Sequence, residues 1–128
     1  MSETAYAKAH FQLDSPAVDL PVGFGIVTAC NPMGVTVEAL VNEGLDRDLG
    51  LFLLGQGIPH FRVTGGSRDM SHAEPGYGCA VDPERIVELG RQWNQEAVFW
   101  VQGEQLFLVS CDGSKHEEPL GSFRDRLI

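Results

Sequence analysis

A chain of 128 residues, 43% hydrophobic and 21% charged, has the size and composition of one folded domain, which excludes a disordered or fibrous protein. Its formal charge of −9 repels nucleic-acid phosphates and anionic lipids, so we expect neither a nucleic acid nor a membrane as partner. Met1–Thr4 lacks the features of a secretion signal, and no apolar run approaches the ~20 residues of a membrane span, which predicts a cytoplasmic protein.

Residues 1–22 are predicted to form an arm that leads into the core. Within the arm, residues 4–11 have the spacing of two helical turns, and the prolines of residues 15–21 then favour an extended connection. The following run, Phe24–Cys30, is apolar on both alternating faces, which predicts a central strand covered on both sides. The turn-forming pair Asn31-Pro32 ends this strand.

A long helix is expected next, with Thr36 as its N-cap and Glu38 in its first turn. Apolar residues then recur with helical spacing, and Gly55 ends the helix. Residues 58–64 alternate apolar and polar side chains. Because they contain Pro59, which is tolerated mainly at sheet edges, we predict an edge strand.

Residues 65–76 form the longest irregular stretch, and a loop of that length is usually functional or mobile. Tyr77–Val81 predicts a short strand. Asp82-Pro83-Glu84 supplies the cap, the first-turn proline and the first-turn acid of a second helix.

Residues 97–111 contain two β-prone runs joined by Gly103-Glu104, the pattern of a type II′ hairpin. We expect these two strands to pair antiparallel. In the tail, residues 112–128, the last apolar side chains are expected to pack back on the core, with Arg124 and Arg126 near solvent.

This order of elements predicts an α+β fold in a single domain, residues 1–128. The core, residues 23–111, fits a ferredoxin-like split βαβ sheet with an added C-terminal hairpin strand, preceded by an N-terminal helical arm. In that topology the first strand lies between the third and fourth, so its end meets their beginnings. The helices cover only one face, and we expect the arm and the tail, rather than a second copy of the chain, to cover the other.

Several motifs are spread over residues 24–111. They are Ile26–Pro32, Asn42, Glu74-Pro75 and Gln95-x-Ala97-Val98-Phe99. In these motifs the chain resembles the bacterial family catalogued as domain of unknown function 3293 (DUF3293). It departs from the family in having Cys30 in place of an aromatic residue and Gly76-Tyr77 in place of Ser-Phe. The resemblance implies a shared fold and a shared polar site, and it leaves the function open because the family has no established activity.

Polar residues from three stretches are predicted to meet and bind a ligand. They are Thr28, Asn31, Asn42, Glu74 and Gln95. Amides and one carboxylate beside a helix N-terminus suit a small polar molecule. The alternative is that these side chains cap turns and tie loops together, as Asn before Pro commonly does. Asn42 weighs against that alternative, because Asn is a poor helix former.

Other chemistry has weaker support. Asp69, His72 and Glu74 offer metal ligands, but a His-x-Glu pair in a loop lacks the helical register of zinc motifs. Cys30 with His72 would be a thiol nucleophile and its base, yet an apolar strand raises the pKa of a thiol. We therefore expect neither a metal nor a cofactor.

The three cysteines, Cys30, Cys79 and Cys111, form no even set and no C-x-x-C pair. Each lies in an apolar, strand-like run. The sequence therefore predicts buried, unbridged thiols.

Three functions remain open. The first is a non-enzymatic module that binds a small molecule or a partner in a polar pocket at the end of the first core strand. The second is a small enzyme in which Glu74 is the general base while His72, Asn31 and Gln95 orient the substrate. The third is a structural subunit of an oligomer. The sequence leaves open whether the protein is a monomer or a homodimer.

Overall fold

The structure, a computed structural model, describes residues 6–14, 19–114 and 116–128. Expectations for residues 1–5 and 15–18 lie outside this range. The elements are β1 (His10–Leu13), β2 (Gly23–Val27), η1 (Pro32–Gly34), α2 (Ala39–Gly55), β3 (His60–Gly66), β4 (Ala73–Cys79), α3 (Pro83–Gln92), β5 (Ala97–Gln102), β6 (Gln105–Ser110), β7 (Glu117–Ser122) and η2 (Arg124–Arg126). In this part of the chain, no helix has the length and apolar character needed to cross a membrane.

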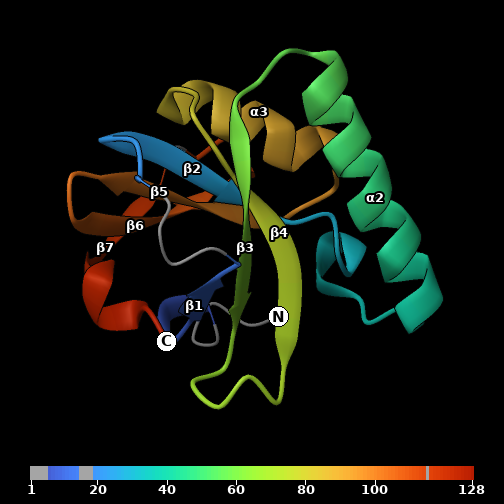
Figure 1. Ribbon diagram of the computed structural model, residues 1–128, viewed down its shortest axis with the longest axis horizontal. Coiled ribbons are helices and arrows are strands. Elements are labelled where there is room, and N and C mark those ends of the chain that lie inside the picture. Colours follow the sequence, from blue (N-terminus) through green and yellow to red (C-terminus); the bar gives the residue numbers. More distant parts are fainter. Residues whose placement is uncertain (1–5, 15–18, 115) are drawn as a thin grey trace.

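The strands form one seven-stranded sheet in the order β1-β3-β4-β2-β5-β6-β7, and neighbouring strands are antiparallel. β2 lies between β4 and β5, which confirms the predicted neighbours of the first core strand. The ferredoxin-like split βαβ prediction is nevertheless wrong. The sheet continues through β1 at one edge and through β6 and β7 at the other, and it curls into a half-barrel that carries α2 and α3 in the described part of the chain (Figure 1).

The two edge strands explain most of the error. The arm was expected to be helical. In its described residues, 6–14 and 19–22, the helix is confined to Tyr6 and Ala7, and residues 10–13 pair with β3 as strand β1. β3 is therefore not an edge strand. Four residues are too few for periodicity to distinguish a helix from a strand. β7, with the sequence EEPLGS, contains the weak strand formers Pro and Gly, yet it pairs with β6.

The predicted long loop is also shorter than expected. Strand pairing extends β3 to Gly66 and begins β4 at Ala73, so only residues 67–72 connect them. Glycine weakens the interior of a strand and is a poor indicator of one. The pair Gly65-Gly66 therefore did not indicate that β3 extends to Gly66.

One of the two predicted helix starts is correct. Asp82 caps α3, accepting a hydrogen bond from the Arg85 N–H at 2.8 Å. Thr36 does not cap α2, which begins at Ala39. The Val37 N–H donates to the Asn31 Oδ1 at 3.2 Å, and this bond holds the preceding segment against the turn after β2, outside the helix.

The helices cover the convex face of the sheet. Buried side chains of α2 and α3, including Leu49, Leu53, Ile86 and Leu89, pack against the strands there. Gly25 in β2 allows α3 to lie this close, because a Cβ at position 25 would overlap the Ile86 side chain. A single methyl group at this glycine would therefore push the helix off the sheet.

The concave face is covered from within the chain, as predicted. Phe11 of β1 is fully buried, and its ring centroid lies 5.1 Å from that of Phe99 and 5.3 Å from that of Phe123. Phe24 packs edge-on against Phe61 at 5.2 Å on the same face. The arm and the tail thus fill the half-barrel with aromatic rings.

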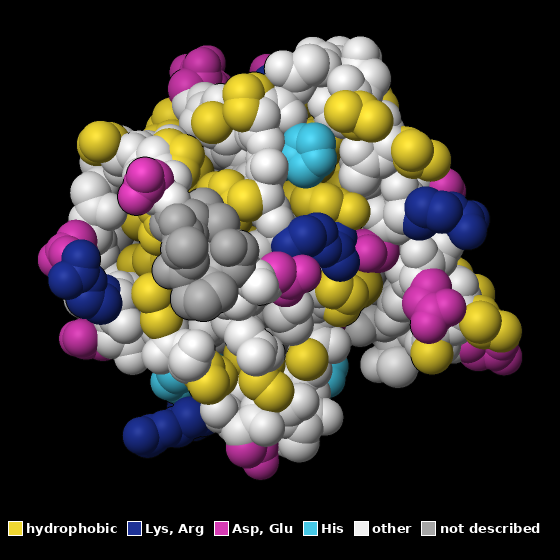
Figure 2. Space-filling model, viewed as in Figure 1, with side chains coloured by type: hydrophobic (Ala, Val, Ile, Leu, Met, Phe, Trp, Pro, Cys, Tyr) yellow, Lys and Arg dark blue, Asp and Glu magenta, His cyan; other side chains and the backbone are white. Residues whose placement is uncertain are grey.

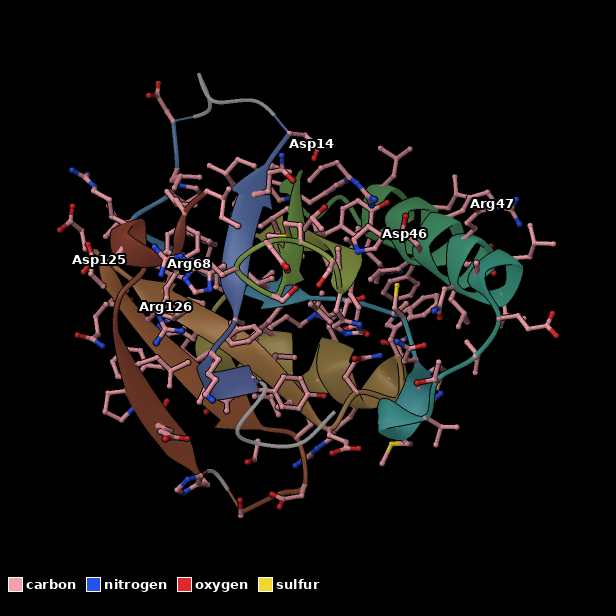
Figure 3. The ribbon with its side chains drawn as sticks, turned by 90° about the horizontal axis from the view of Figure 1, so that it is seen from below. Asp14, Asp46, Arg47, Arg68, Asp125 and Arg126 are labelled. Carbon is pink, nitrogen blue, oxygen red and sulfur yellow. The ribbon has the colours of Figure 1, made fainter. Side chains whose placement is uncertain are left out.

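Arg126 joins the two open edges of the half-barrel. Its Nη1 donates to the carbonyl oxygens of Ala7 and Ala9 at 2.8 and 3.0 Å, and its Nη2 donates to that of Leu120 in β7 at 2.9 Å. Figure 3 shows Arg126 close to β1. A parallel bridge between Phe11 and Leu127 continues this seam. Arg126 is therefore half-buried and structural, whereas Arg124 stays exposed, as predicted.

Candidate functional site

Three stretches that are distant in sequence meet where β2 ends. Thr28 Oγ1 donates to the Pro75 carbonyl in β4 at 3.0 Å. Gln95, just before β5, donates from Nε2 to the Cys30 carbonyl at 3.1 Å. This convergence was predicted from the position of β2 between β4 and β5.

Asn31 is the centre of the polar cluster. Its backbone is left-handed, with φ 49°, a conformation that Asn adopts more readily than most residues. Its N–H donates to the Asn42 Oδ1 at 2.8 Å, and its own Oδ1 accepts from the Asn42 Nδ2 at 2.9 Å. Its Nδ2 then donates to the Glu74 Oε1 at 3.0 Å. The two amides therefore hold one oxygen of the Glu74 carboxylate in place.

This arrangement gives Asn42 and Gln95 structural contacts. Asn42 lies in the first turn of α2 and ties the start of that helix to Asn31. Gln95 is only 7% exposed, and its Nε2 donates to the carbonyls of Cys30 and Trp93. These amides thus bind the protein itself around the end of β2.

A hollow of about 320 Å³, which we call the arm pocket, lies between residues 6–11 and the concave face of strands β2 to β5. Its walls are mainly apolar and include Ala9, Phe11, Ile26, Val63, Ala97 and Phe99. Of the predicted ligand-binding residues, Thr28 and Glu74 line it, whereas Asn31, Asn42 and Gln95 do not. The predicted site therefore contains an apolar pocket with one half-buried carboxylate.

Tyr6 separates the arm pocket from a wider, more open hollow of about 850 Å³, which we call the outer hollow. Glu96 and Gln95 border the outer hollow. Burial, helped by the negative charges of Glu96 and Glu74, raises the pKa of Tyr6 to about 12. The phenol therefore stays protonated at neutral pH and lies in a negative field. Tyr6 was not among the predicted site residues, because no motif in the arm indicates that it lines a site.

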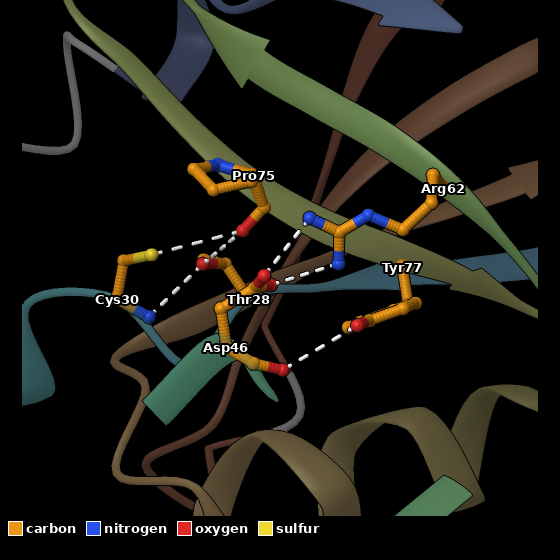
Figure 4. A network of polar contacts seen from close by, with 6 residues as sticks. All are labelled: Thr28, Cys30, Asp46, Arg62, Pro75 and Tyr77. Atoms are coloured by element: carbon orange, nitrogen blue, oxygen red, sulfur yellow. Dashed lines mark hydrogen bonds and ion pairs between the residues drawn. The ribbon is translucent and has the colours of Figure 1, made fainter. Parts of the chain in front are cut away.

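A second polar network, beside the cluster, fastens α2 to the sheet (Figure 4). Arg62 in β3 donates from both terminal nitrogens to the two carboxylate oxygens of Asp46, each at 2.9 Å. The same guanidinium lies 4.3 Å from the centre of the Tyr77 ring, and the Tyr77 hydroxyl donates to the Asp46 carbonyl at 3.4 Å. This network was not predicted, because no local spacing in the sequence links Asp46 to Arg62.

The loop at residues 67–72 is organised by its own side chains. Asp69 Oδ1 accepts from the N–H and hydroxyl of Ser71 at 3.0 and 2.8 Å and from the Ser67 hydroxyl at 3.0 Å. These hydrogen bonds, first those from Ser71, lower the pKa of Asp69. In residues 6–14, 19–114 and 116–128, no group of three His, Cys, Asp or Glu side chains is placed to hold a metal ion.

The three thiols are buried and unbridged, as predicted. Burial raises the pKa of Cys79 to about 12 and that of Cys111 to about 11. It also raises the pKa of Cys30, whose Sγ donates to the Pro75 carbonyl at 3.7 Å. A protonated thiol directed at a carbonyl does not suit a nucleophile activated by His72.

The family described as "Protein of unknown function (DUF3293)" matches residues 27–98, more than half of the chain. The chain belongs to this family. The DUF3293 match includes Asn31, Asn42, Glu74 and Gln95, and it leaves β1, β6 and β7 outside. No curated protein and no solved structure matches the chain. Membership in DUF3293 therefore establishes the family of the chain but implies no activity for it.

Proposed function

We propose that this DUF3293 protein binds a small, mainly apolar molecule in the arm pocket. One observation carries the proposal: the hollow has an apolar lining with a fixed, half-buried carboxylate, Glu74, in its wall. Its volume of about 320 Å³ falls at the lower end of the ~300 to 1,000 Å³ typical of ligand pockets. The unbridged thiols support the cytoplasm as the place where the protein works.

Binding is better supported than catalysis. A general base needs partners that orient the substrate, but Asn31 and Gln95 use their amide N–H groups on the protein itself. His72 is exposed at the mouth of the pocket. In the described part of the chain, it forms no side-chain hydrogen bond with Glu74. The groups that the enzyme hypothesis requires, namely a general base and side chains free to orient a substrate, are therefore not brought together.

Filling the arm pocket tests the proposal. Gly65 in β3 pairs with Glu74 and lines the pocket, and a Cβ there would contact the Phe11 ring at an ordinary 3.5 Å. Gly65→Val should therefore fold and obstruct the pocket. Gly55→Ala is the matched control, because a Cβ at position 55 meets nothing within 4 Å and lies outside the pocket.

The probe is 2-phenylethanol, a small aromatic alcohol, titrated into the ¹⁵N-labelled protein and followed by amide chemical shifts. We expect saturable shifts at pocket residues such as Phe99 and Thr28 in the wild type and in Gly55→Ala. Gly65→Val should lose them while keeping a folded spectrum. Shifts that spread over the surface, or that persist in Gly65→Val, would contradict the proposal.

A second candidate function, subunit of a homodimer, is favoured by the outer side of α2. Leu40, Leu51 and Leu54 are 77%, 61% and 69% exposed there, and apolar side chains remain visible along this helix in Figure 2. With Gly44 and Arg47 they follow the 4-3-4-3 spacing of a helix–helix seam. In an antiparallel pair, Leu51 faces Gly44 and Leu40 faces Leu54. Arg47 faces its own copy, so we expect a weak dimer.

Sedimentation velocity at increasing protein concentration tests the dimer. The average mass of the wild type should rise toward twice that of a monomer, and Leu51→Asp should remain monomeric. Val22→Asp is the control, because Val22 is 74% exposed on a different part of the surface. A constant monomer mass for the wild type, or an equal effect of both substitutions, would rule out the α2 seam.

A further inference from the structure

We propose that the ligand of the arm pocket carries a protonated amine, or another small organic cation, that pairs with Glu74. The inference rests on the proposed function and specifies its ligand class. Three features of the pocket support it. The carboxylate has no counter-ion among the described residues, the walls are aromatic, and the positive side chains at the mouth are exposed to solvent.

The Glu74 carboxylate is fixed but lacks a counter-ion. Asn31 Nδ2 donates to Oε1 at 3.0 Å, and Asn31 is itself held by Asn42. Within residues 6–14, 19–114 and 116–128, this is the only hydrogen bond to the carboxylate, and no Lys, Arg or His side chain pairs with it. The second oxygen therefore keeps its acceptor sites for a ligand. A half-buried, unpaired charge is costly, and a bound cation would lower that cost.

The walls next to Glu74 also suit a cation. Tyr6, Phe11 and Phe99 line the same pocket, and the Tyr6 and Phe11 rings lie edge-to-face with Phe99 at 6.4 and 5.1 Å. The faces of aromatic rings attract ammonium groups within about 6 Å. The raised pKa of Tyr6 reflects burial and the negative field of Glu96 and Glu74 at this position. The same field that disfavours a phenolate favours a cation.

The positive side chains at the mouth of the pocket would favour an anion instead. Lys8 and His72 line the mouth, and both are exposed, so water and salt screen their charges. Glu74 is half-buried and fixed, so its charge acts more strongly on a group inside the pocket. We therefore expect a cationic ligand to bind more tightly than an anionic one.

Three probes with the same aromatic body test this ranking: 2-phenylethylamine, 2-phenylethanol and phenylacetate. Their dissociation constants are measured by amide chemical shifts for the wild type, Glu74→Gln and Glu96→Gln. A hydrogen bond to a charged group corresponds to a preference of about 10- to 100-fold for the amine over the alcohol. Glu74→Gln should remove this preference for the amine over the alcohol.

Glu96→Gln is the matched control, because Glu96 also acts on Tyr6 but borders the outer hollow. It should keep most of the preference for the amine. Equal binding of amine and alcohol, or tighter binding of phenylacetate, overturns the inference. An equal effect of Glu74→Gln and Glu96→Gln also overturns it, because the preference would then come from the overall negative charge and not from Glu74.

Failure of the proposed function gives a different result. If none of the probes binds, both claims are overturned. If the probes bind but Gly65→Val leaves their binding intact, the arm pocket is not the binding site.

Discussion

Substitution of Phe11 by Ala tests how strongly the arm holds the half-barrel together. Phe11 is 0% exposed and contacts the rings of Phe99 and Phe123. Removal of a fully buried Phe side chain costs about 3 to 5 kcal/mol. A domain of this size has about 5 to 15 kcal/mol in total. We therefore expect Phe11→Ala to remove a large fraction of the stability, which corresponds to a fall in Tm of roughly 10 to 20 °C.

Equilibrium urea unfolding measures this loss. The control is Gln12→Ala, which lies on the same strand but faces solvent and should change the free energy of unfolding by less than about 0.5 kcal/mol. Deletion of residues 1–13 removes the whole of β1 and should cost at least as much as Phe11→Ala. A loss below about 1 kcal/mol for Phe11→Ala would refute the packing argument, because no fully buried ring is that dispensable.

Three further predictions concern the sheet and its helices. Gly25→Ala should destabilise the protein by about 1 to 3 kcal/mol in urea unfolding, because the methyl group overlaps Ile86, and a neutral effect would contradict that contact. Asp82→Ala should cost about 1 kcal/mol by losing the cap of α3, whereas Asp82→Ser should cost less. Stability should be full below pH 9 and fall as the pH rises toward 12, because folding raises the pKa of Cys79 from 9.0 to about 12 and that of Tyr6 from 10.0 to about 12. In pH-dependent thermal melts Cys79→Ala should flatten the early part of that fall, and an unchanged profile would contradict the assignment.

The sequence predicted the middle of the fold better than its edges. β2, the β5–β6 hairpin and the Asp82 cap have strong local signals, namely an apolar run, a Gly-first turn and a cap-proline-acid series. The edges depend on distant pairing. β1 is four residues long, and its partners in β3 lie about 50 residues away. β7 is polar, so its place in the sheet follows from β6 and not from its own composition.

The polar cluster was predicted better than the pocket beside it. Asn31, Glu74 and Gln95 meet because β2 lies between β4 and β5, and that order was readable from the succession of elements. The apolar walls of the arm pocket could not be predicted in this way, because they depend on where the N-terminal arm lies. Tyr6 and Phe11 line the pocket only because residues 10–13 form a strand.

The hydrogen bonds of Arg126 join a segment that is synthesised early in translation to one that is synthesised late. Its hydrogen bonds to Ala7 and Ala9 span 119 and 117 residues of sequence. Contacts of such range slow folding, because loop closure precedes the energy that it releases. On the ribosome, the strands that carry the aromatic side chains of the concave face are synthesised before Phe123 and Arg126. Until residues 123–126 are synthesised, these apolar side chains lack their C-terminal cover. We expect chaperone binding and aggregation of the nascent chain to be greatest at that stage.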